Sequence, residues 1–156
     1  MQGTSTQSTE DPDLNPTAVH IRTHMTAAPY SIGVDQPLDV AHDLMRAHRI
    51  RHLPVLRGGK LVGLLSQRDL YLIETLRDVD PRSVTVEEAM TQDAYAVAPS
   101  TPLAKVAKEM AEQRYGCAVV VEAAQVVGIF TAVDALRALA GLLGAQVPAP
   151  GRGHES

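Results

Sequence analysis

The chain has 156 residues, enough for one compact domain, and its 45% hydrophobic and 21% charged residues are typical of a soluble globular protein. A net charge of −4 gives no global attraction to nucleic acid or to an anionic membrane surface. No apolar run reaches the ~18 residues of a transmembrane helix, no signal-peptide pattern opens the chain, and the single cysteine excludes an internal disulfide. We therefore expect a cytoplasmic protein.

Both ends of the chain have the composition of unstructured segments. Residues 1–17 are rich in Ser, Thr, Gln, Asp and Pro, and residues 144–156 are rich in Pro and Gly. We predict disordered tails over these two segments and a folded region between them.

The folded region contains an internal repeat, because residues 25–70 recur at 90–135 with a constant offset of 65 and no gap. Eleven of the 46 aligned positions are identical, where about three would match by chance at average composition. Two copies of one small supersecondary unit must pack together to bury a core. We predict a first repeat over 18–80, a second over 81–143, and a cleft between them as the place for a ligand.

Each copy has the pattern of a strand, a helix, two strands and a second helix. In the first copy these elements are predicted at 30–34, from 37 onward, 53–56, 61–66 and 67–76. Asp35 and Ser66 stand where N-caps are needed, and Gly58-Gly59 is a strong hairpin signal.

The second copy gives the same elements at 94–98, 102–114, 118–121, 126–130 and after Thr131. The last helix of each copy is apolar on nearly all sides, as in Leu70-Tyr71-Leu72-Ile73. A helix of this kind is buried on more than one face. We therefore predict a homodimer in which a second chain covers part of these helices.

A hydroxyl and a carboxylate recur at each predicted junction between the third strand and the last helix. Ser66 is followed three residues later by Asp69, and Thr131 by Asp134. Unpaired backbone N–H groups and the helix dipole favour a phosphate there, and a carboxylate can accept bonds from ribose hydroxyls. The same residues are also good helix caps, so the pattern alone leaves both interpretations open.

Basic residues gather in the first copy only. Six Arg and Lys residues and two histidines, with no acid, occupy positions 46–68, whereas the matching window 111–133 has one Arg and two Glu. Such a run is usually a solvated face, but Arg51, His52 and Arg68 are placed to reach a ligand at the junction. The asymmetry predicts two unequal clefts with one strong anion site.

Other chemistry is weakly supported. Cys117 begins an apolar strand and is expected to be a core residue. No nucleophile elbow, oxyanion signature or metal-ligand cluster accompanies the polar residues. We expect neither an enzyme nor a metal site.

The chain resembles a tandem pair of CBS domains, often called a Bateman module. The matching residues include Met25-Thr26, the segment 50–55, the segment 63–70 and their counterparts in the second copy. The resemblance covers about 20–142 and implies an α/β (α+β) fold of two pseudo-symmetric β-α-β-β-α repeats. With no catalytic domain attached, it also implies a stand-alone module.

The resemblance further implies clefts that bind AMP, ADP or ATP, or in some members S-adenosylmethionine or NAD. By this resemblance Asp69 and Asp134 would hold ribose hydroxyls, Ser66 and Thr131 would face phosphates, and Arg51 and His52 would contact phosphates. Gly116 and Cys117 replace that basic pair in the second repeat.

Two functions follow from these observations. The favoured one is an adenine-nucleotide-sensing regulatory module acting on a partner protein whose identity the sequence does not give. The alternative is a degenerate pair that serves as a dimerisation or interaction scaffold without a ligand. Intact hydroxyl and carboxylate motifs in both repeats favour the first.

Overall fold

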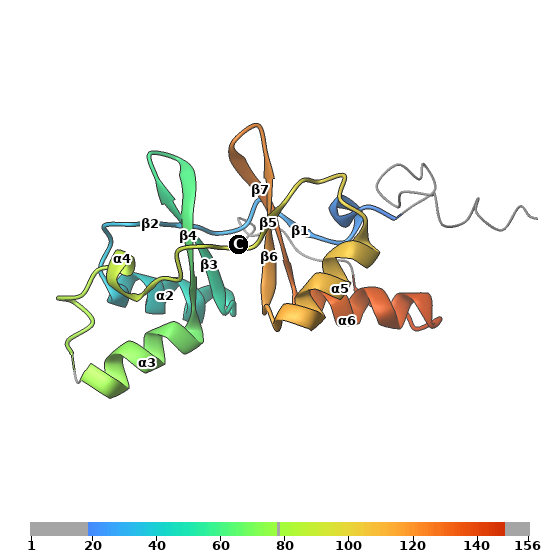
Figure 1. Cartoon of the computed structure of the whole chain (residues 1–156). Coiled ribbons are helices and arrows are strands. Elements are labelled where there is room, and N and C mark those ends of the chain that lie inside the picture. Colours follow the sequence, from blue (N-terminus) through green and yellow to red (C-terminus); the bar gives the residue numbers. More distant parts are fainter. Residues whose placement is uncertain (1–18, 78, 149–156) are drawn as a thin grey trace, which may run out of the picture.

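The computed structural model describes residues 19–77 and 79–148. The predicted tails 1–17 and most of 144–156 lie outside these residues. The described chain forms two similar halves, each a small sheet with helices packed on it (Figure 1).

The first half contains a three-stranded sheet in the order β2-β3-β4. Its parts are β2 (Ile32–Gly33), α2 (Leu38–His48), β3 (His52–Arg57), β4 (Lys60–Ser66), α3 (Gln67–Arg77) and α4 (Val86–Ala89).

The second half contains a four-stranded sheet in the order β1-β7-β6-β5. Its parts are η2 (Ile21–Thr23), β1 (Thr26–Ala27), β5 (Ala96–Val97), α5 (Leu103–Gln113), β6 (Cys117–Glu122), β7 (Gln125–Thr131) and α6 (Ala132–Leu142).

The predicted order of elements is confirmed in both repeats, with boundaries that move by a few residues. In each sheet the hairpin pairs antiparallel and the short strand before the first helix pairs parallel. The expectation that Asp35 caps the first helix is wrong. Pro37 is the N-cap of α2, in extended backbone, and it makes no side-chain cap hydrogen bond.

The first segment of each repeat packs on the other half. β1 pairs antiparallel with β7, with Thr26 opposite Ile129, and Thr91 exchanges two 2.9 Å backbone hydrogen bonds with Leu64. These two pairings are equivalent under the repeat offset of 65. This exchange was not predictable from the sequence, because two-residue pairings carry no recognisable periodicity.

The same exchange continues just upstream. The Leu103 amide donates to Val19 and the Leu38 amide to Val84, at 2.7 and 2.9 Å, and these are again equivalent positions. The two hydrophobic cores follow this arrangement: Ile21 is buried in the core of the second half, and Val84 and Val86 in that of the first. Neither repeat therefore completes its core from its own contiguous residues.

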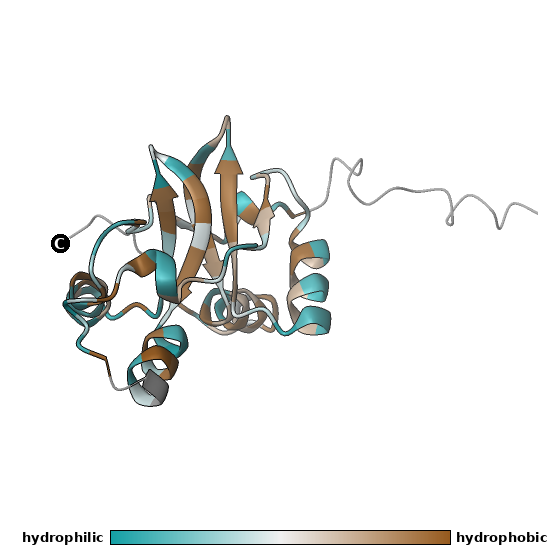
Figure 2. Ribbon diagram, turned by 60° about the vertical axis from the view of Figure 1, so that its left-hand side comes forward, coloured by the Kyte–Doolittle hydropathy of each residue, from teal (hydrophilic) through white to brown (hydrophobic). Residues whose placement is uncertain are grey.

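A repeated glycine and a repeated methionine meet at the exchange. A Cβ built on Gly63 would lie 2.6 Å from Met90 Sδ and 2.8 Å from the Thr91 backbone oxygen. A Cβ on Gly128 would meet the side chain of Met25. Figure 2 shows that the strands of both sheets are largely hydrophobic. The glycines are required by close approach of the other repeat.

We predict that Gly63→Ala destabilises the fold by about 1–3 kcal/mol, as overpacking does, and that Gly128→Ala costs less. A backbone oxygen blocks a Cβ at Gly63, whereas the three nearest atoms at Gly128 all belong to the flexible Met25 side chain. Urea denaturation measures the free energies of unfolding. Gly141→Ala is the control, because nothing lies within 4 Å of its Cβ; equal losses for all three variants would contradict this account.

Candidate functional site

A cavity of about 910 Å³ lies between the two halves. The first repeat contributes the start of β3 and the junction of β4 with α3, and the second contributes the segment 91–95 and the turn between α5 and β6. Five of the seven predicted site residues line it: Arg51, His52, Ser66, Arg68 and Asp69. Thr131 and Asp134 lie outside this cavity.

The strand register explains why two separate motifs meet here. His52 lies opposite Ser66 in the antiparallel β3–β4 pair, and the Gln67 amide donates a 2.9 Å hydrogen bond to the Arg51 carbonyl. The basic pair at the start of β3 is therefore beside the junction that carries the hydroxyl and the carboxylate.

Ser66 and Asp69 form a capping box at the start of α3. The Asp69 amide donates to Ser66 Oγ at 3.1 Å, and the Ser66 amide donates to Asp69 Oδ2 at 2.9 Å. Among the described residues Asp69 has no other hydrogen-bond partner, and its side chain is half-buried at the cavity. The cap fixes one carboxylate oxygen and leaves Oδ1 available to a ligand.

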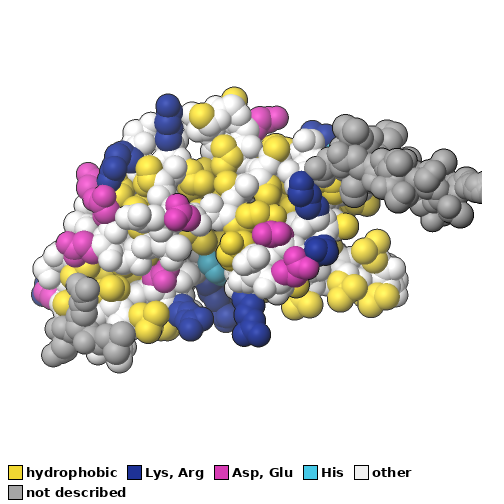
Figure 3. All heavy atoms as spheres, viewed as in Figure 1, with side chains coloured by type: hydrophobic (Ala, Val, Ile, Leu, Met, Phe, Trp, Pro, Cys, Tyr) yellow, Lys and Arg dark blue, Asp and Glu magenta, His cyan; other side chains and the backbone are white. Residues whose placement is uncertain are grey.

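Three arginines line the same cavity: Arg51 and Arg68 from the first repeat and Arg114 from the second. Within the described part of the chain none of them makes an ion pair. Figure 3 shows basic side chains gathered at the lower edge of the molecule, between the two halves and next to a histidine. Unpaired guanidinium groups around a cavity favour an anion.

His52 lies where the two repeats touch. Burial lowers the pKa of its imidazole below the ordinary 6.5, and Arg51 adds to this effect while Asp69 opposes it. A Cβ on Gly116 would lie 2.9 Å from His52 Nε2. The glycine that replaces the arginine in the second repeat therefore makes room for the histidine of the first.

The second repeat also supplies an aromatic wall that the sequence reasoning missed. Tyr95 and Tyr115 both line the cavity, and their rings stack with centroids 5.1 Å apart. A flat apolar surface of this kind suits a purine base. Tyr95 is one of the identical repeat positions, with Tyr30 as its partner, and this identity was the signal available in the sequence.

The carboxylate of the second repeat has a different environment. Asp134 is almost completely buried and accepts hydrogen bonds from the Thr131 amide at 2.9 Å and from the Thr131 hydroxyl at 3.2 Å. Thr131 and Asp134 also form a capping box on α6. The two repeats thus share one backbone motif and differ in what surrounds it.

Cys117 is buried in the cavity wall, as expected of a core residue. Burial, with the nearby Asp134 charge, raises the pKa of its thiol to about 12. A thiol of this kind is a poor nucleophile at neutral pH.

Among the described residues no three His, Cys, Asp or Glu side chains are grouped as metal ligands would be. No described helix has the length and apolarity to cross a membrane.

Comparison with known proteins identifies the family. The model of the CBS domain matches twice, at residues 19–73 and 86–141. The chain belongs to the CBS-domain family. Its two repeats form a tandem CBS pair, or Bateman module, with the mixed α and β structure expected from the sequence.

Solved structures of CBS pairs share this fold. A putative acetoin utilization protein, AcuB, from Vibrio cholerae is 32% identical, with a TM-score of 0.73, 81% of this chain covered and 93% of that one. The CBS pair of protein MJ0100, solved with 5′-methylthioadenosine and S-adenosyl-L-methionine, is 25% identical with the same TM-score, over 80% of this chain and 98% of the other.

A longer curated relative also contains the module. Inosine-5′-monophosphate dehydrogenase of Korarchaeum cryptofilum is 34% identical over 105 residues, which are 67% of this chain and 21% of that protein. The chain therefore spans about a fifth of that relative's length.

Proposed function

We propose that this CBS pair is a regulatory module that binds an adenine nucleotide in the cavity between its repeats and modulates a partner protein. The observation that carries the proposal is the set of three unpaired arginines around a cavity that also holds a capped carboxylate. The arginines favour phosphates, and Asp69 Oδ1 is free to accept bonds from ribose hydroxyls.

Each part of the ligand has a matching group in the cavity. Arg51, His52 and Arg68 would face the phosphates together with the Ser66 junction, and Asp69 would hold the ribose. The stacked Tyr95 and Tyr115 rings offer an apolar face for adenine. Relatedness to the MJ0100 pair, which holds two adenosine compounds, supports this ligand class.

The charge of the cavity favours AMP, ADP or ATP over the other adenosine ligands. S-adenosylmethionine carries a sulfonium cation and no phosphate, so unpaired arginines give it little advantage. NAD shares the adenosine and phosphate groups and remains an alternative ligand. We propose binding and no reaction, because the cysteine in the cavity wall has a thiol pKa raised to about 12 and is a poor nucleophile at neutral pH.

A scaffold function without ligand is the second candidate. The exposed apolar residues of α6 favour it, since they offer an interaction surface whether or not the cavity is filled. The two candidates differ in whether an adenosine compound stabilises the protein. Modulation of a partner and a cytoplasmic location remain part of the first proposal.

A thermal-shift screen tests the proposed function. A ligand that binds only the folded state adds about 2.7 kcal/mol at a hundredfold excess over Kd, which moves the Tm of a chain this size by several degrees. We expect AMP, ADP or ATP to give such a shift. If these three, S-adenosylmethionine and NAD all leave the Tm unchanged at millimolar concentration, the scaffold function replaces the sensing one.

We predict that Arg51→Ala weakens ATP or AMP by roughly ten- to a hundredfold, about 1.5–3 kcal/mol for a charge-assisted hydrogen bond. Adenosine, which lacks a phosphate, should lose little. Titration calorimetry measures both, and added salt should lower the affinity for ATP more than that for adenosine.

Arg57→Ala is the matched control for Arg51→Ala. Arg57 lies outside the cavity and pairs with Glu87 at 2.6 Å, so its loss should leave nucleotide affinity unchanged. Equal losses for ATP and adenosine in Arg51→Ala would mean that the basic segment is only a solvated face.

We further propose that the module is a homodimer through α6. Its exposed apolar residues include Leu136, 64% exposed, and Leu139, 50% exposed. Leu136 and Leu139 lie three residues apart, and the C-cap Leu143 follows four residues later, so the three side chains lie on one side of the helix. A second copy of the chain presents the same apolar face and can cover it by two-fold symmetry.

We predict that Leu136→Lys converts a dimer of twice 16.7 kDa into a monomer, because a charge would then lie in the apolar contact. Light scattering at tens of micromolar protein measures the mass. Val19→Lys is the control, since Val19 is also exposed but lies outside α6. A wild-type mass of 16.7 kDa would contradict the proposed dimer.

A further inference from the structure

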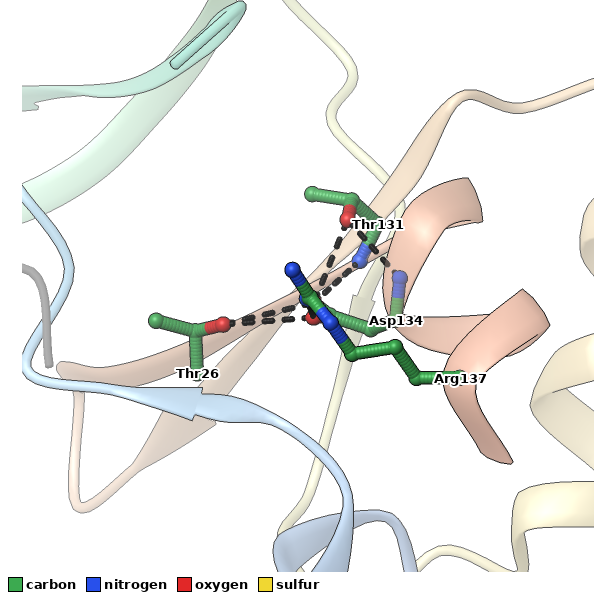
Figure 4. Close-up of polar contacts among 4 residues, drawn as sticks. All are labelled: Thr26, Thr131, Asp134 and Arg137. Carbon is green, nitrogen blue, oxygen red and sulfur yellow. Dashed lines mark hydrogen bonds and ion pairs between the residues drawn. The ribbon is translucent and has the colours of Figure 1, made fainter. Parts of the chain in front are cut away.

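The carboxylate of the second repeat is fully engaged by the protein itself. Besides Thr131, Asp134 accepts a 3.1 Å hydrogen bond from Arg137 Nη1 at Oδ1, and the Thr26 hydroxyl lies 3.4 Å from both carboxylate oxygens (Figure 4). Only 2% of the Asp134 side chain is exposed. Both oxygens are therefore occupied by groups of the chain.

The equivalent carboxylate of the first repeat lacks this pair. Asp69 is followed three residues later by Leu72, the counterpart of Arg137. Leu72 lines the cavity and cannot donate a hydrogen bond. Thr91, the counterpart of Thr26, also lines the cavity, and no hydrogen bond joins it to Asp69 among the described residues.

Helix geometry places the Arg137 guanidinium on the carboxylate. Residues three apart on α6 are neighbours on one face, so Arg137 and Asp134 form an ion pair within the helix. A nearly buried carboxylate without a counter-charge is unfavourable. To bind Asp134, a ribose hydroxyl would have to displace this guanidinium. The hydroxyl is a neutral donor, and hydrogen bonds from neutral donors to a carboxylate are weaker than those from charged donors.

We propose that Arg137 is an internal counter-ion that closes the second ribose site, so that each chain binds one adenine nucleotide, in the cavity that contains Asp69. The inference rests on the proposed function. On this inference, the residue three positions after each carboxylate determines which site binds the nucleotide: Leu72 leaves the first site open, and Arg137 closes the second. The predicted role of Asp134 in holding a ribose would then require the loss of Arg137.

Exchanging the two residues tests the inference. Arg137→Leu gives the second repeat the residue found at the equivalent position of the first, and Leu72→Arg gives the first repeat the counter-ion of the second. In titration calorimetry with ATP and with AMP, we expect one site per chain in the wild type and a second site in Arg137→Leu. We expect Leu72→Arg to bind at least tenfold more weakly than the wild type.

Two variants separate charge from size. Arg137→Lys keeps the positive charge and should keep one site per chain. Leu72→Gln adds a polar side chain without charge, so its affinity should fall clearly less than that of Leu72→Arg. If Arg137→Leu does not fold by circular dichroism, Arg137→Gln also removes the charge and carries the same expectation of a second site.

The outcomes distinguish this inference from the proposed function. Two sites in the wild type, one site in Arg137→Leu, or equal affinities for Leu72→Arg and Leu72→Gln would overturn the inference and leave nucleotide binding intact. Absence of binding by the wild type and by every variant would reject the proposed function, and the inference with it.

Discussion

Each repeat contributes its first segment to the hydrophobic core of the other half. β1 completes the sheet of the second half, and Thr91 bonds to β4 of the first. Each exchange needs a glycine in the facing strand, because the other repeat's methionine occupies the space of a Cβ. The crossing segment of the second repeat also forms one wall of the cavity, through Thr91 and the residues that follow it.

The two repeats have nearly the same backbone, but different charged groups surround their equivalent carboxylates. Equivalent hydrogen bonds at equivalent positions hold the junctions, as in the bonds from Gln67 to Arg51 and from Ala132 to Gly116. The first junction faces unpaired arginines, whereas the second carboxylate is neutralised by Arg137. Two copies of one fold can thus differ in ligand binding through a few side chains, while the exchange of segments keeps the packing of both copies the same.

The sequence predicted most of the secondary structure because that information is local. Helical spacing, the Gly58-Gly59 hairpin and the Ser66 cap each depend on neighbouring residues, and each is confirmed. The exchange escaped prediction because two-residue pairings between distant segments have no local pattern. Five of the seven candidate site residues share one cavity, since strand register follows from the hairpin, but Arg114 and the tyrosine pair come from the other repeat.

The cavity lies between the two repeats, so the proposed ligand would act on the contact between them. A nucleotide there would contact the β4–α3 junction of one repeat and the α5–β6 turn of the other, so its binding energy would depend on how the halves sit together. His52 is packed against Gly116 at this contact, and burial holds its pKa low. A phosphate beside His52 would favour the protonated imidazole, so the charge at the contact between repeats would change with occupancy.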